Sequence, residues 1–449
     1  MNLYGQNILV VGLGDTGLSA ARWLARRGAT VRVADSRATP PNLARLREIL
    51  PDVPVSSGAF KAADFDWAER IVVSPGVAVA EPQIQQARAR GVAVEGDVEL
   101  FARAVPGAAK VIAITGSNGK STVTSMVGAM CAAAGKKTAI AGNIGMPVLD
   151  ALDDYPDADI YVLELSSFQL ETTYSLNPAA ASVLNISADH LDRYADLAAY
   201  AAAKAHIFNG NGVQVVNRND KRSLGMVQPG RQVLSFGLDR AHGEQQFGMA
   251  DGKLWQGSQP LMALPELPLA GLHNAANALA AFALCRALDL PVAPLAEALR
   301  SFRGLPHRVE WVAEISGVVF YDDSKGTNVG ATEAALRGMD RPVVLIVGGD
   351  GKGQDFSPLR DAVAQRARAV VQIGRDGGLV AAAIAGAGVP VLRAASMQDA
   401  VQQAFGAARP GDAVLLSPAC ASFDMFANYV QRAQAFIDAV HSLSRGAHP

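Results

Sequence analysis

Hydrophobic and polar positions along this chain follow two different patterns. Short continuous runs of valine, isoleucine, leucine and alanine recur at intervals, and such runs are typical of strands buried on both faces of a parallel sheet. Between them, hydrophobic residues recur every three or four positions, which is the spacing of helices with one buried face. The pattern predicts an α/β protein whose parallel sheets are covered by helices on both sides.

The alternation of strands and helices falls into three successive segments. A prior of roughly 150 residues per domain gives a similar count for 449 residues. We predict three domains, 1–98, 99–304 and 305–449. Residues 228–268 are polar and glycine-rich, and we expect short antiparallel strands or loop there. The expected strands are NILVVG, TVRVAD and RIVVSPG, then KVIAITG, KKTAIAG, DIYVLELS, AASVLNIS and GVQVVN, then VVFYDDS, PVVLIVGG, AVVQIG, PVLRA and AVLLSPA.

Composition excludes several classes of protein. Forty basic and 42 acidic residues give a net charge of -2, so there is no basic field for non-specific nucleic-acid binding. Cys131, Cys285 and Cys420 are far apart, which indicates neither a zinc site nor a disulfide framework. Neither a basic leader nor an apolar stretch of membrane-spanning length is seen. We expect a soluble, cytoplasmic protein without membrane insertion, and discount Asn185-Ile186-Ser187 as a chance glycosylation acceptor.

A glycine-rich turn follows the first expected strand and opens a helix. Gly12, Gly14 and Gly17 fit G-x-G-x-x-G, and Asp35 ends the second strand. These features fit a dinucleotide fingerprint, in which glycines let the backbone approach a pyrophosphate at a helix N-terminus. The turn indicates diphosphate binding without saying which nucleotide, and a tight turn without a ligand is the alternative.

A second glycine-rich turn, in ITGSNGKSTVTSMV, resembles a phosphate-binding loop. Gly119, Lys120 and Ser121 fit the end of G-x-x-x-x-G-K-[ST], but Ile114 stands where the leading glycine belongs. The amides at the helix start and the Lys120 ammonium would favour a polyphosphate, and Ser121 could ligate Mg²⁺. A plain turn is the alternative.

Polar residues after the following strands extend this site. Glu164 ends the strand DIYVLEL, and in phosphate-loop enzymes an acid in such a place holds Mg²⁺. His190 follows another strand, where a hydrogen-bonded structural histidine is an equal alternative. Together with Ser121 at the same sheet edge, these residues make a second metal plausible. Lys204, in AYAAAKAHIF, would by itself be a solvated charge on a helix.

Further polar loops follow strands of the second and third segments. Asn274 and Asn277 begin a helix, where amides can cap the helix or read the edge of a purine, and capping is the simpler interpretation. Arg308 lies in GLPHRVE near the expected domain boundary. The loops Asp322–Asn328, Gly348–Lys352 and Ser417–Ser422 follow strands, where parallel sheets bind ligands.

Nine motifs in order resemble those of the Mur ligases, and most closely those of the branch that adds D-glutamate. They are ITGSNGKST, AGNIG, ELSSFQLE, DHLDRY with a following AAK, HNAANALAA, GLPHRVE, DDSKGTNVGAT, GGDGKGQDF and SPACASFD. The resemblance covers essentially the whole chain. These ligases use a shorter loop, G-[ST]-N-G-K-[ST], which accounts for Ile114 as the strand residue leading into it.

The resemblance implies a fold and an activity. The fold is an N-terminal Rossmann-like domain for the UDP moiety, a central phosphate-loop ATPase domain and a C-terminal Rossmann-like domain for the amino acid. The activity is that of an ATP-dependent peptide ligase in peptidoglycan precursor synthesis, which joins D-glutamate to UDP-N-acetylmuramoyl-L-alanine through an acyl phosphate. ATP and two Mg²⁺ ions would be required, and we expect a monomer.

The resemblance also assigns residues. The expected catalytic residues are Lys120, Glu164, His190 and Lys204, and the metal ligands are Ser121, Glu164, His190 and a carbamylated Lys204. The ATP contacts are Gly116, Ser117, Asn118, Gly119, Lys120, Ser121, Thr122, Asn274, Asn277, Arg308 and Asp323. The UDP-substrate contacts are Thr16, Ser36, Arg37, Ser74, Pro75, Gly76 and Asn143. The D-glutamate contacts are Lys325, Thr327, Lys352, Ser422 and Tyr429.

The sequence departs from the family pattern at two positions, and several alternative functions remain open. Asp15 stands where these ligases commonly have an apolar residue, which leaves the detail of the uracil pocket open, and Tyr429 replaces a frequent phenylalanine. Sister Mur ligases and folylpolyglutamate synthetase, which add other amino acids, are the near alternatives, although the Asp-Asn-Pro-Arg tetrad of diaminopimelate addition is absent. A nicotinamide oxidoreductase or a non-enzymatic nucleotide switch would leave most of these motifs unused.

Overall fold

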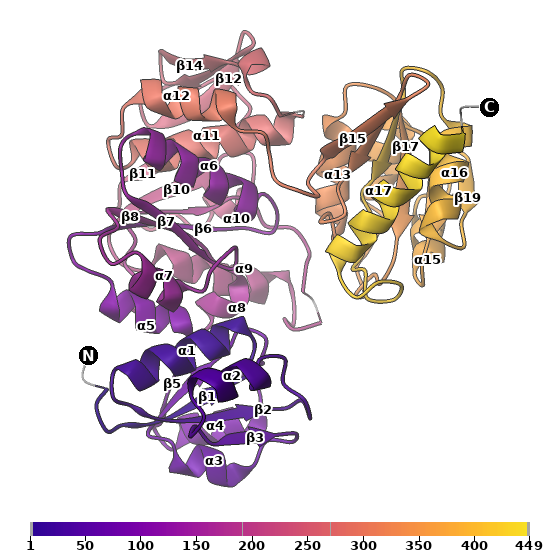
Figure 1. The fold of residues 1–449 in the computed structure, drawn as a ribbon. Coiled ribbons are helices and arrows are strands. Elements are labelled where there is room, and N and C mark those ends of the chain that lie inside the picture. The colour runs from indigo at the N-terminus through magenta and orange to yellow at the C-terminus, as the bar shows by residue number, and fades with distance from the viewer. Residues whose placement is uncertain (1–2, 191, 270, 447–449) are drawn as a thin grey trace.

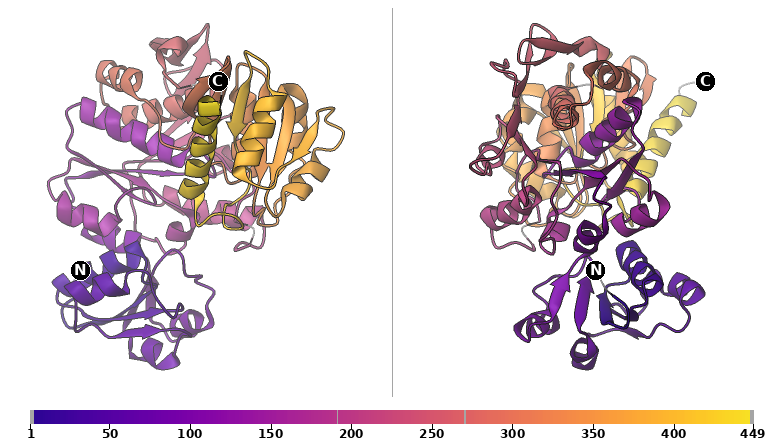
Figure 2. Two further views of the ribbon diagram at one scale, coloured as in Figure 1. Left: turned by 45° about the vertical axis from the view of Figure 1, so that its right-hand side comes forward. Right: turned by 90° about the vertical axis from the view of Figure 1, so that its left-hand side faces the viewer.

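The computed structural model describes residues 3–446 except residues 191 and 270. Within them the strands form three sheets, as the sequence pattern predicts. Figure 1 shows the N-terminal and central domains stacked one above the other, with the C-terminal domain beside the central one, and both views in Figure 2 agree. No helix in the described part of the chain combines the length and apolar character needed to cross a membrane.

The N-terminal domain is built on a five-stranded parallel sheet in the order β3-β2-β1-β4-β5. This is the strand order of a Rossmann fold without its sixth strand. The strands are β1 (Asn7–Val11), β2 (Thr30–Asp35), β3 (Val55–Ser57), β4 (Arg70–Val73) and β5 (Ala93–Glu95). The helices are α1 (Asp15–Arg26), α2 (Leu43–Ile49), α3 (Ala62–Trp67) and α4 (Pro82–Ala89).

The central domain has a nine-stranded sheet in the order β14-β13-β12-β11-β10-β9-β6-β8-β7. The seven neighbouring strands β12, β11, β10, β9, β6, β8 and β7 are parallel. Strands β12, β13 and β14 form an antiparallel meander. The strands are β6 (Lys110–Thr115), β7 (Thr138–Gly142), β8 (Ile160–Glu164), β9 (Ala180–Val183), β10 (Val213–Asn217), β11 (Val233–Phe236), β12 (Gln246–Ala250), β13 (Lys253–Gln256) and β14 (Gln259–Ala263). The helices are α5 (Asp97–Ala104), α6 (Lys120–Ala133), α7 (Val148–Asp154), α8 (Ser167–Leu170), α9 (Leu197–Ala205), α10 (Lys221–Leu224), α11 (Leu272–Arg286) and α12 (Val292–Ser301), with 3-10 turns at His206–Phe208 and Leu264–Glu266.

The C-terminal domain has a six-stranded sheet in the order β15-β16-β20-β17-β18-β19, parallel except for β15. The strands are β15 (Glu310–Ile315), β16 (Val318–Asp322), β17 (Val343–Gly348), β18 (Ala367–Ile373), β19 (Val391–Arg393) and β20 (Ala413–Leu416). The helices are α13 (Val329–Gly338), α14 (Leu359–Arg366), α15 (Gly377–Ala383), α16 (Met397–Ala407) and α17 (Tyr429–Gly446).

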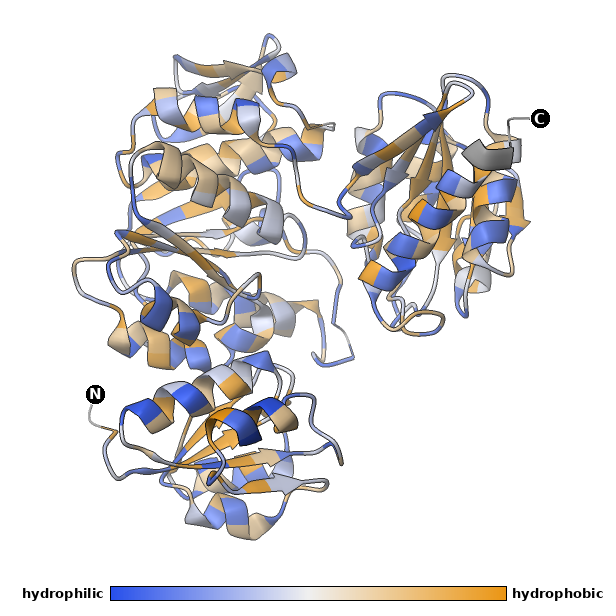
Figure 3. Cartoon of the chain, viewed as in Figure 1, coloured by the Kyte–Doolittle hydropathy of each residue, from blue (hydrophilic) through white to orange (hydrophobic). Residues whose placement is uncertain are grey.

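Alternate residues of β6 face two different cores. Ile112 and Ile114 pack with α6 and α11, whereas Val111 and Ala113 face a core shared with the N-terminal domain. Burial on both faces explains why these strands are continuous hydrophobic runs. Figure 3 shows hydrophobic residues concentrated on the strands, while the surrounding helices carry hydrophilic and hydrophobic patches.

Charged contacts dock the N-terminal domain onto the central one. On α1, Arg22 Nη2 lies 2.7 Å from Asp150 Oδ1 of α7. Arg26 and Arg27 both pair with Asp153, at 3.1 and 3.3 Å. These ion pairs hold α1 of the N-terminal domain against α7 of the central domain.

Gly17, in the first turn of α1, permits the tight turn after β1. A Cβ at this position would lie 1.8 Å from the Gly12 carbonyl oxygen. We expect Gly17→Ala to destabilise the protein by about 3 kcal/mol, because backbone must move, and this outweighs the roughly 1 kcal/mol by which alanine favours a helix. The midpoint of thermal unfolding, followed by circular dichroism, should fall by several degrees.

Gly14→Ala is the matched control, since a Cβ on Gly14 meets no heavy atom within 4 Å. Its unfolding midpoint should stay close to that of the unmodified protein. Equal midpoints for the two variants would contradict the backbone clash.

Candidate active site

The loop between β6 and α6 is held in place by hydrogen bonds from Asn185, which follows the neighbouring strand β9. Gly119 has a φ of +84° and immediately precedes α6. Lys120 Nζ donates to the carbonyls of Gly116 and Ser117, at 2.9 and 3.0 Å. The side chain of Asn185 accepts from Asn118 N at 2.8 Å and donates to Asn118 O at 3.0 Å. Asn185 begins the tripeptide that was discounted above as a chance glycosylation acceptor. Its side chain therefore anchors the loop that resembles a phosphate-binding loop.

Glu164 places a carboxylate directly beside this loop. Its backbone pairs with Ile114 of β6, and the residue is only 2% exposed. Oε1 accepts a 2.8 Å hydrogen bond from Asn143 Nδ2, whereas Oε2 is buried and has no partner among the described residues. A buried oxygen without a partner carries a desolvation penalty, which a bound cation would remove.

Lys204 is buried beneath the same loop and is not the solvated helix charge expected from its local sequence. It is 1% exposed, and its Nζ donates to Thr115 Oγ1 at 3.2 Å and lies 4.7 Å from the ring centre of Tyr200. Burial, together with the nearby Lys120 ammonium, lowers the pKa of Lys204 well below its usual range. A neutral amine is therefore favoured there, and a neutral amine is a nucleophile.

His190 lies next to these groups with an unusual backbone. Its φ is +55°, and its ring packs edge-on against Phe168 with 4.8 Å between ring centres. Its ring centre is 6.3 Å from that of Tyr200, which connects it to the Lys204 region. Burial lowers the pKa of His190. The neutral imidazole is the form that binds metals.

A cavity of about 380 Å³ lies between the central and C-terminal domains and gathers most of the expected nucleotide contacts. Arg308 Nη2 reaches across it to donate to Ser121 Oγ at 2.9 Å. Burial raises the pKa of Asp323 to about 7, although the Ser417 hydroxyl and Arg308 oppose the shift. Expected ATP contacts that line the cavity are Asn118, Gly119, Thr122, Asn274, Asn277, Arg308 and Asp323. Gly116, Ser117, Lys120 and Ser121 belong to the adjoining loop and helix start.

The asparagines of this cavity do not cap α11, which corrects the simpler sequence interpretation. Gly271 occupies the N-cap position, and no side-chain cap is present. Asn277 Nδ2 donates to Asn274 Oδ1 at 3.2 Å. Asn274 and Asn277 therefore lie within α11, and both residues line the cavity.

A second cavity, of about 480 Å³, lies between the N-terminal and central domains. The Asp35 carboxylate shapes it by accepting from Leu13 N at 2.7 Å and from Arg37 Nη2 at 2.6 Å. Asp15, the departure noted in the sequence, is exposed, lines the cavity and accepts from Asn42 Nδ2 at 3.0 Å. All expected UDP-substrate contacts line this cavity, namely Thr16, Ser36, Arg37, Ser74, Pro75, Gly76 and Asn143.

The expected amino-acid contacts lie in loops of the C-terminal domain, except Tyr429, which begins α17. Lys325 Nζ donates to the Tyr429 hydroxyl at 3.3 Å, and Thr327 N donates to the Lys325 carbonyl at 3.0 Å. Lys352 Nζ donates to Asp189 Oδ1 of the central domain at 3.0 Å. Ser422 is 3% exposed and begins the turn that leads into α17.

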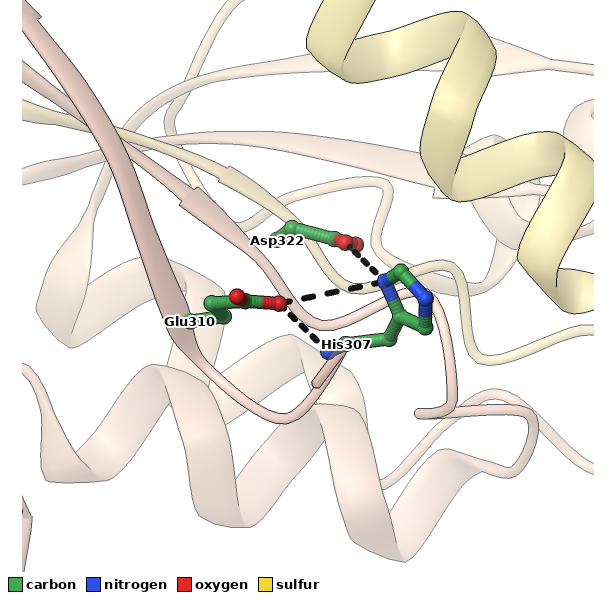
Figure 4. Close-up of side chains that lie close together, drawn as sticks. All are labelled: His307, Glu310 and Asp322. Atoms are coloured by element: carbon green, nitrogen blue, oxygen red, sulfur yellow. Dashed lines mark hydrogen bonds and ion pairs between the residues drawn. The ribbon is translucent and has the colours of Figure 1, made fainter. Parts of the chain in front are cut away.

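A histidine and two acids at the start of the C-terminal domain form a separate cluster (Figure 4). His307 Nδ1 lies 2.7 Å from Asp322 Oδ2, and the Glu310 carboxylate accepts from His307 N at 2.8 Å. Asp322 Oδ1 accepts from Ser324 N at 2.8 Å. Since these ligand atoms already pair with one another or with backbone, the cluster is a brace for the domain connection. Sequence reasoning quoted His307 only within a motif and missed this role.

Three domain families match successive parts of the chain. Residues 6–96 match the MurD-like N-terminal domain of Mur ligases, residues 114–285 the Mur ligase middle domain, and residues 307–420 the Mur ligase glutamate ligase domain.

Curated relatives match nearly the full length. The UDP-N-acetylmuramoylalanine–D-glutamate ligase of Thiobacillus denitrificans is 60% identical over 463 residues, covering 99% of this chain and 98% of that protein. The ligase of the same name from Methylobacillus flagellatus is 60% identical over 449 residues and covers 99% of both chains.

Solved structures match the fold. A pseudomurein peptide ligase type C from Methanothermus fervidus has a TM-score of 0.61 at 17% identity and covers 98% of this chain and 100% of its own. The UDP-N-acetylmuramate-alanine ligase of Thermotoga maritima has a TM-score of 0.60 at 19% identity and covers 97% of this chain and 99% of its own. At these identities the likeness concerns the fold alone.

Proposed function

The chain belongs to the Mur ligase family, and from this premise we propose that it joins D-glutamate to the L-alanine carboxylate of UDP-N-acetylmuramoyl-L-alanine, using ATP, in peptidoglycan precursor synthesis. The observation that carries the proposal is the identity with D-glutamate ligases along the whole chain. The two interdomain cavities support it, because they offer separate places for a UDP-linked substrate and a nucleotide.

The reaction needs an activated carboxylate, since oxide is a very poor leaving group. In the proposed sequence the substrate carboxylate attacks the γ-phosphorus of ATP, and ADP leaves. The amine of D-glutamate then attacks the acyl phosphate, phosphate leaves and a proton is lost. Lys120 and the amides of its loop bind the β- and γ-phosphates and stabilise their shifting charge, and Arg308 reaches the same place from the C-terminal domain.

The residues around Glu164 fit a magnesium site, because a buried carboxylate oxygen lacks a partner there. Ser121, Glu164, His190 and a carbamylated Lys204 would hold two Mg²⁺ ions. When bound, the ions screen the repulsion between the substrate carboxylate and the γ-phosphate.

Substrate contacts complete the proposal. D-glutamate has two carboxylates, and Lys325 and Lys352 supply two cations, with hydroxyls from Thr327, Ser422 and Tyr429. Adenine would contact Asn274 and Asn277, and the ribose would contact Asp323. Thr16, Ser36, Arg37, Ser74, Pro75, Gly76 and Asn143 would hold the UDP substrate.

We also propose the arrangement of the chain as a working enzyme. Domains 1–98, 99–304 and 305–449 would bind the UDP substrate, ATP and the amino acid. Because each cavity is lined by residues of a single chain, a monomer can supply the complete site. We place the reaction in the cytoplasm, where ATP is available.

An amino-acid panel tests the substrate assignment. The protein is supplied with UDP-N-acetylmuramoyl-L-alanine, ATP and Mg²⁺, and phosphate release is measured with D-glutamate, L-glutamate, L-alanine, meso-diaminopimelate or D-alanyl-D-alanine. We expect release with D-glutamate to exceed that with every other amino acid or peptide by at least about 100-fold, since chirality and both carboxylates must match fixed groups.

Turnover with another amino acid and none with D-glutamate would assign the chain to a different ligase branch. Titration with NADH is the control for an oxidoreductase, and we expect no binding at the N-terminal fingerprint.

A further inference from the structure

Asp189 lies where the central and C-terminal domains meet, and sequence reasoning gave it no role. Only 7% of the residue is exposed. Its Oδ1 accepts from Lys352 Nζ and from His190 N, both at 3.0 Å. Its Oδ2 accepts from Asn328 Nδ2 at 3.3 Å. One buried carboxylate therefore receives two donors from the other domain.

Lys352 is held in a definite place for this contact. Its φ is +51°, in the left-handed region that a lysine rarely adopts. Its backbone N donates to Asp350 Oδ1 at 3.1 Å. A lysine ammonium has three N–H donors, so the bond to Asp189 leaves two for a substrate carboxylate.

Asn328 connects the same carboxylate to the phosphate-binding loop. Its Nδ2 also donates to Asn118 Oδ1 at 3.0 Å, and its Oδ1 accepts from Asn118 Nδ2 at 3.2 Å. The same Oδ1 caps α13 by accepting from Ala331 N at 2.9 Å. A continuous set of hydrogen bonds thus runs from Asn118 through Asn328 and Asp189 to Lys352.

The negative charge of Asp189 makes its pairing with Lys352 energetically important. Asp189 Oδ1 and Lys352 Nζ form a salt bridge at 3.0 Å, and their side chains are only 10% and 20% exposed. A buried charge pair of this kind is costly to break by removing one partner, because the other charge is left unpaired.

We propose that Asp189 is a positioning residue for the amino-acid half of the reaction: it fixes Lys352 for a carboxylate of the incoming amino acid, and Asn328 in turn anchors Asp189 to the phosphate-binding loop. The inference rests on the proposed function, which supplies D-glutamate as the ligand of Lys352. Asp189 itself does not touch the reacting atoms.

Asp189→Asn tests the proposal, since it keeps the shape and removes the charge. We expect the KM for D-glutamate to rise at least about tenfold. The KM values for ATP and UDP-N-acetylmuramoyl-L-alanine should change less than about twofold, because neither ligand is expected to contact Lys352. Steady-state kinetics with each substrate varied in turn separates these constants.

The first half-reaction provides a readout that general damage to the fold would move. Hydroxylamine traps an acyl phosphate as a hydroxamate with release of phosphate, and D-glutamate is not needed. Asp189→Asn should form hydroxamate at close to the unmodified rate. If hydroxamate formation and the glutamate-dependent rate fall equally, Asp189 is not a positioning residue for the amino acid.

Asp192→Asn is the matched control. Asp192 is exposed, lies in the same loop and, like Asp189, acts electrostatically to raise the pKa of His190. It therefore reproduces the loss of a charge near His190 without touching Lys352. An equal rise in the KM for D-glutamate in Asp192→Asn would overturn the proposal.

Asn328→Ser supplies a second variant if Asp189→Asn does not fold. Serine can still cap α13 but is too short to donate to Asp189. We expect a rise of about threefold in the KM for D-glutamate, in line with one neutral hydrogen bond, and an unchanged value would overturn the link through Asn328. Absence of D-glutamate turnover in the unmodified protein would instead refute the proposed function.

Discussion

Lys204→Ala should lower the ligation rate by about 100-fold or more, the scale expected when a group that supports a metal site is removed, and formate or acetate should restore part of it. Burial favours the neutral amine of Lys204. A neutral amine adds to CO₂ to give a carbamate and releases a proton, which turns the side chain into an anion able to ligate Mg²⁺. A small carboxylate that enters the space left by alanine can replace that anion. Phosphate release against added carboxylate concentration measures the rescue.

Lys204→Arg separates a carbamate from a cation at this position. Arginine keeps a positive charge and does not form the carbamate, so it should be as inactive as alanine. Carbon-13 NMR of the unmodified protein with labelled CO₂ should show a carbamate signal that is lost in both variants. Full activity of the arginine variant, or no rescue of the alanine variant at any carboxylate concentration, would contradict the carbamate.

The fold was largely predictable because its strands are buried on both faces. Continuous hydrophobic runs such as Val343–Gly348 and Ile160–Glu164 are recognisable without their partners. The edge strands Val55–Ser57 and Ala93–Glu95 were missed, because three residues carry too little periodicity. The antiparallel strand Glu310–Ile315 was missed because its hydrophobic positions are only partly buried.

The location of a candidate site residue was predictable where its place along its own strand determined it. Glu164 follows from its position at the end of a hydrophobic run, but Lys204 does not, since its burial depends on packing beneath a loop 89 residues away. The link between Asn118 and Asn328 spans 210 residues. Local spacing contains no information about such a contact, and for that reason Asp189 was overlooked as well.

Glu164→Gln should lower the ligation rate by at least about 100-fold and should remove most of the stabilisation that the protein gains from Mg²⁺ with a nucleotide. Glutamine can keep the acceptor for Asn143 Nδ2 but removes the negative charge from the buried oxygen that lacks a partner. Losing that charge takes away a proposed Mg²⁺ ligand and the attraction toward Lys120. Phosphate release at increasing Mg²⁺ should show a lower maximal rate and a higher half-saturating concentration.

Stability provides the independent readout for Glu164. Glutamine places an amide nitrogen without a partner where Oε2 lay and removes the attraction toward Lys120, so in EDTA the unfolding midpoint of Glu164→Gln should not lie above that of the unmodified protein. Mg²⁺ with a nucleotide should raise the midpoint of the unmodified protein by mass action and should raise that of the variant much less. Glu171→Gln is the control, because Glu171 already pairs with Arg193 at 3.0 Å. A variant that keeps the full Mg²⁺-dependent shift would show that Glu164 does not bind the metal.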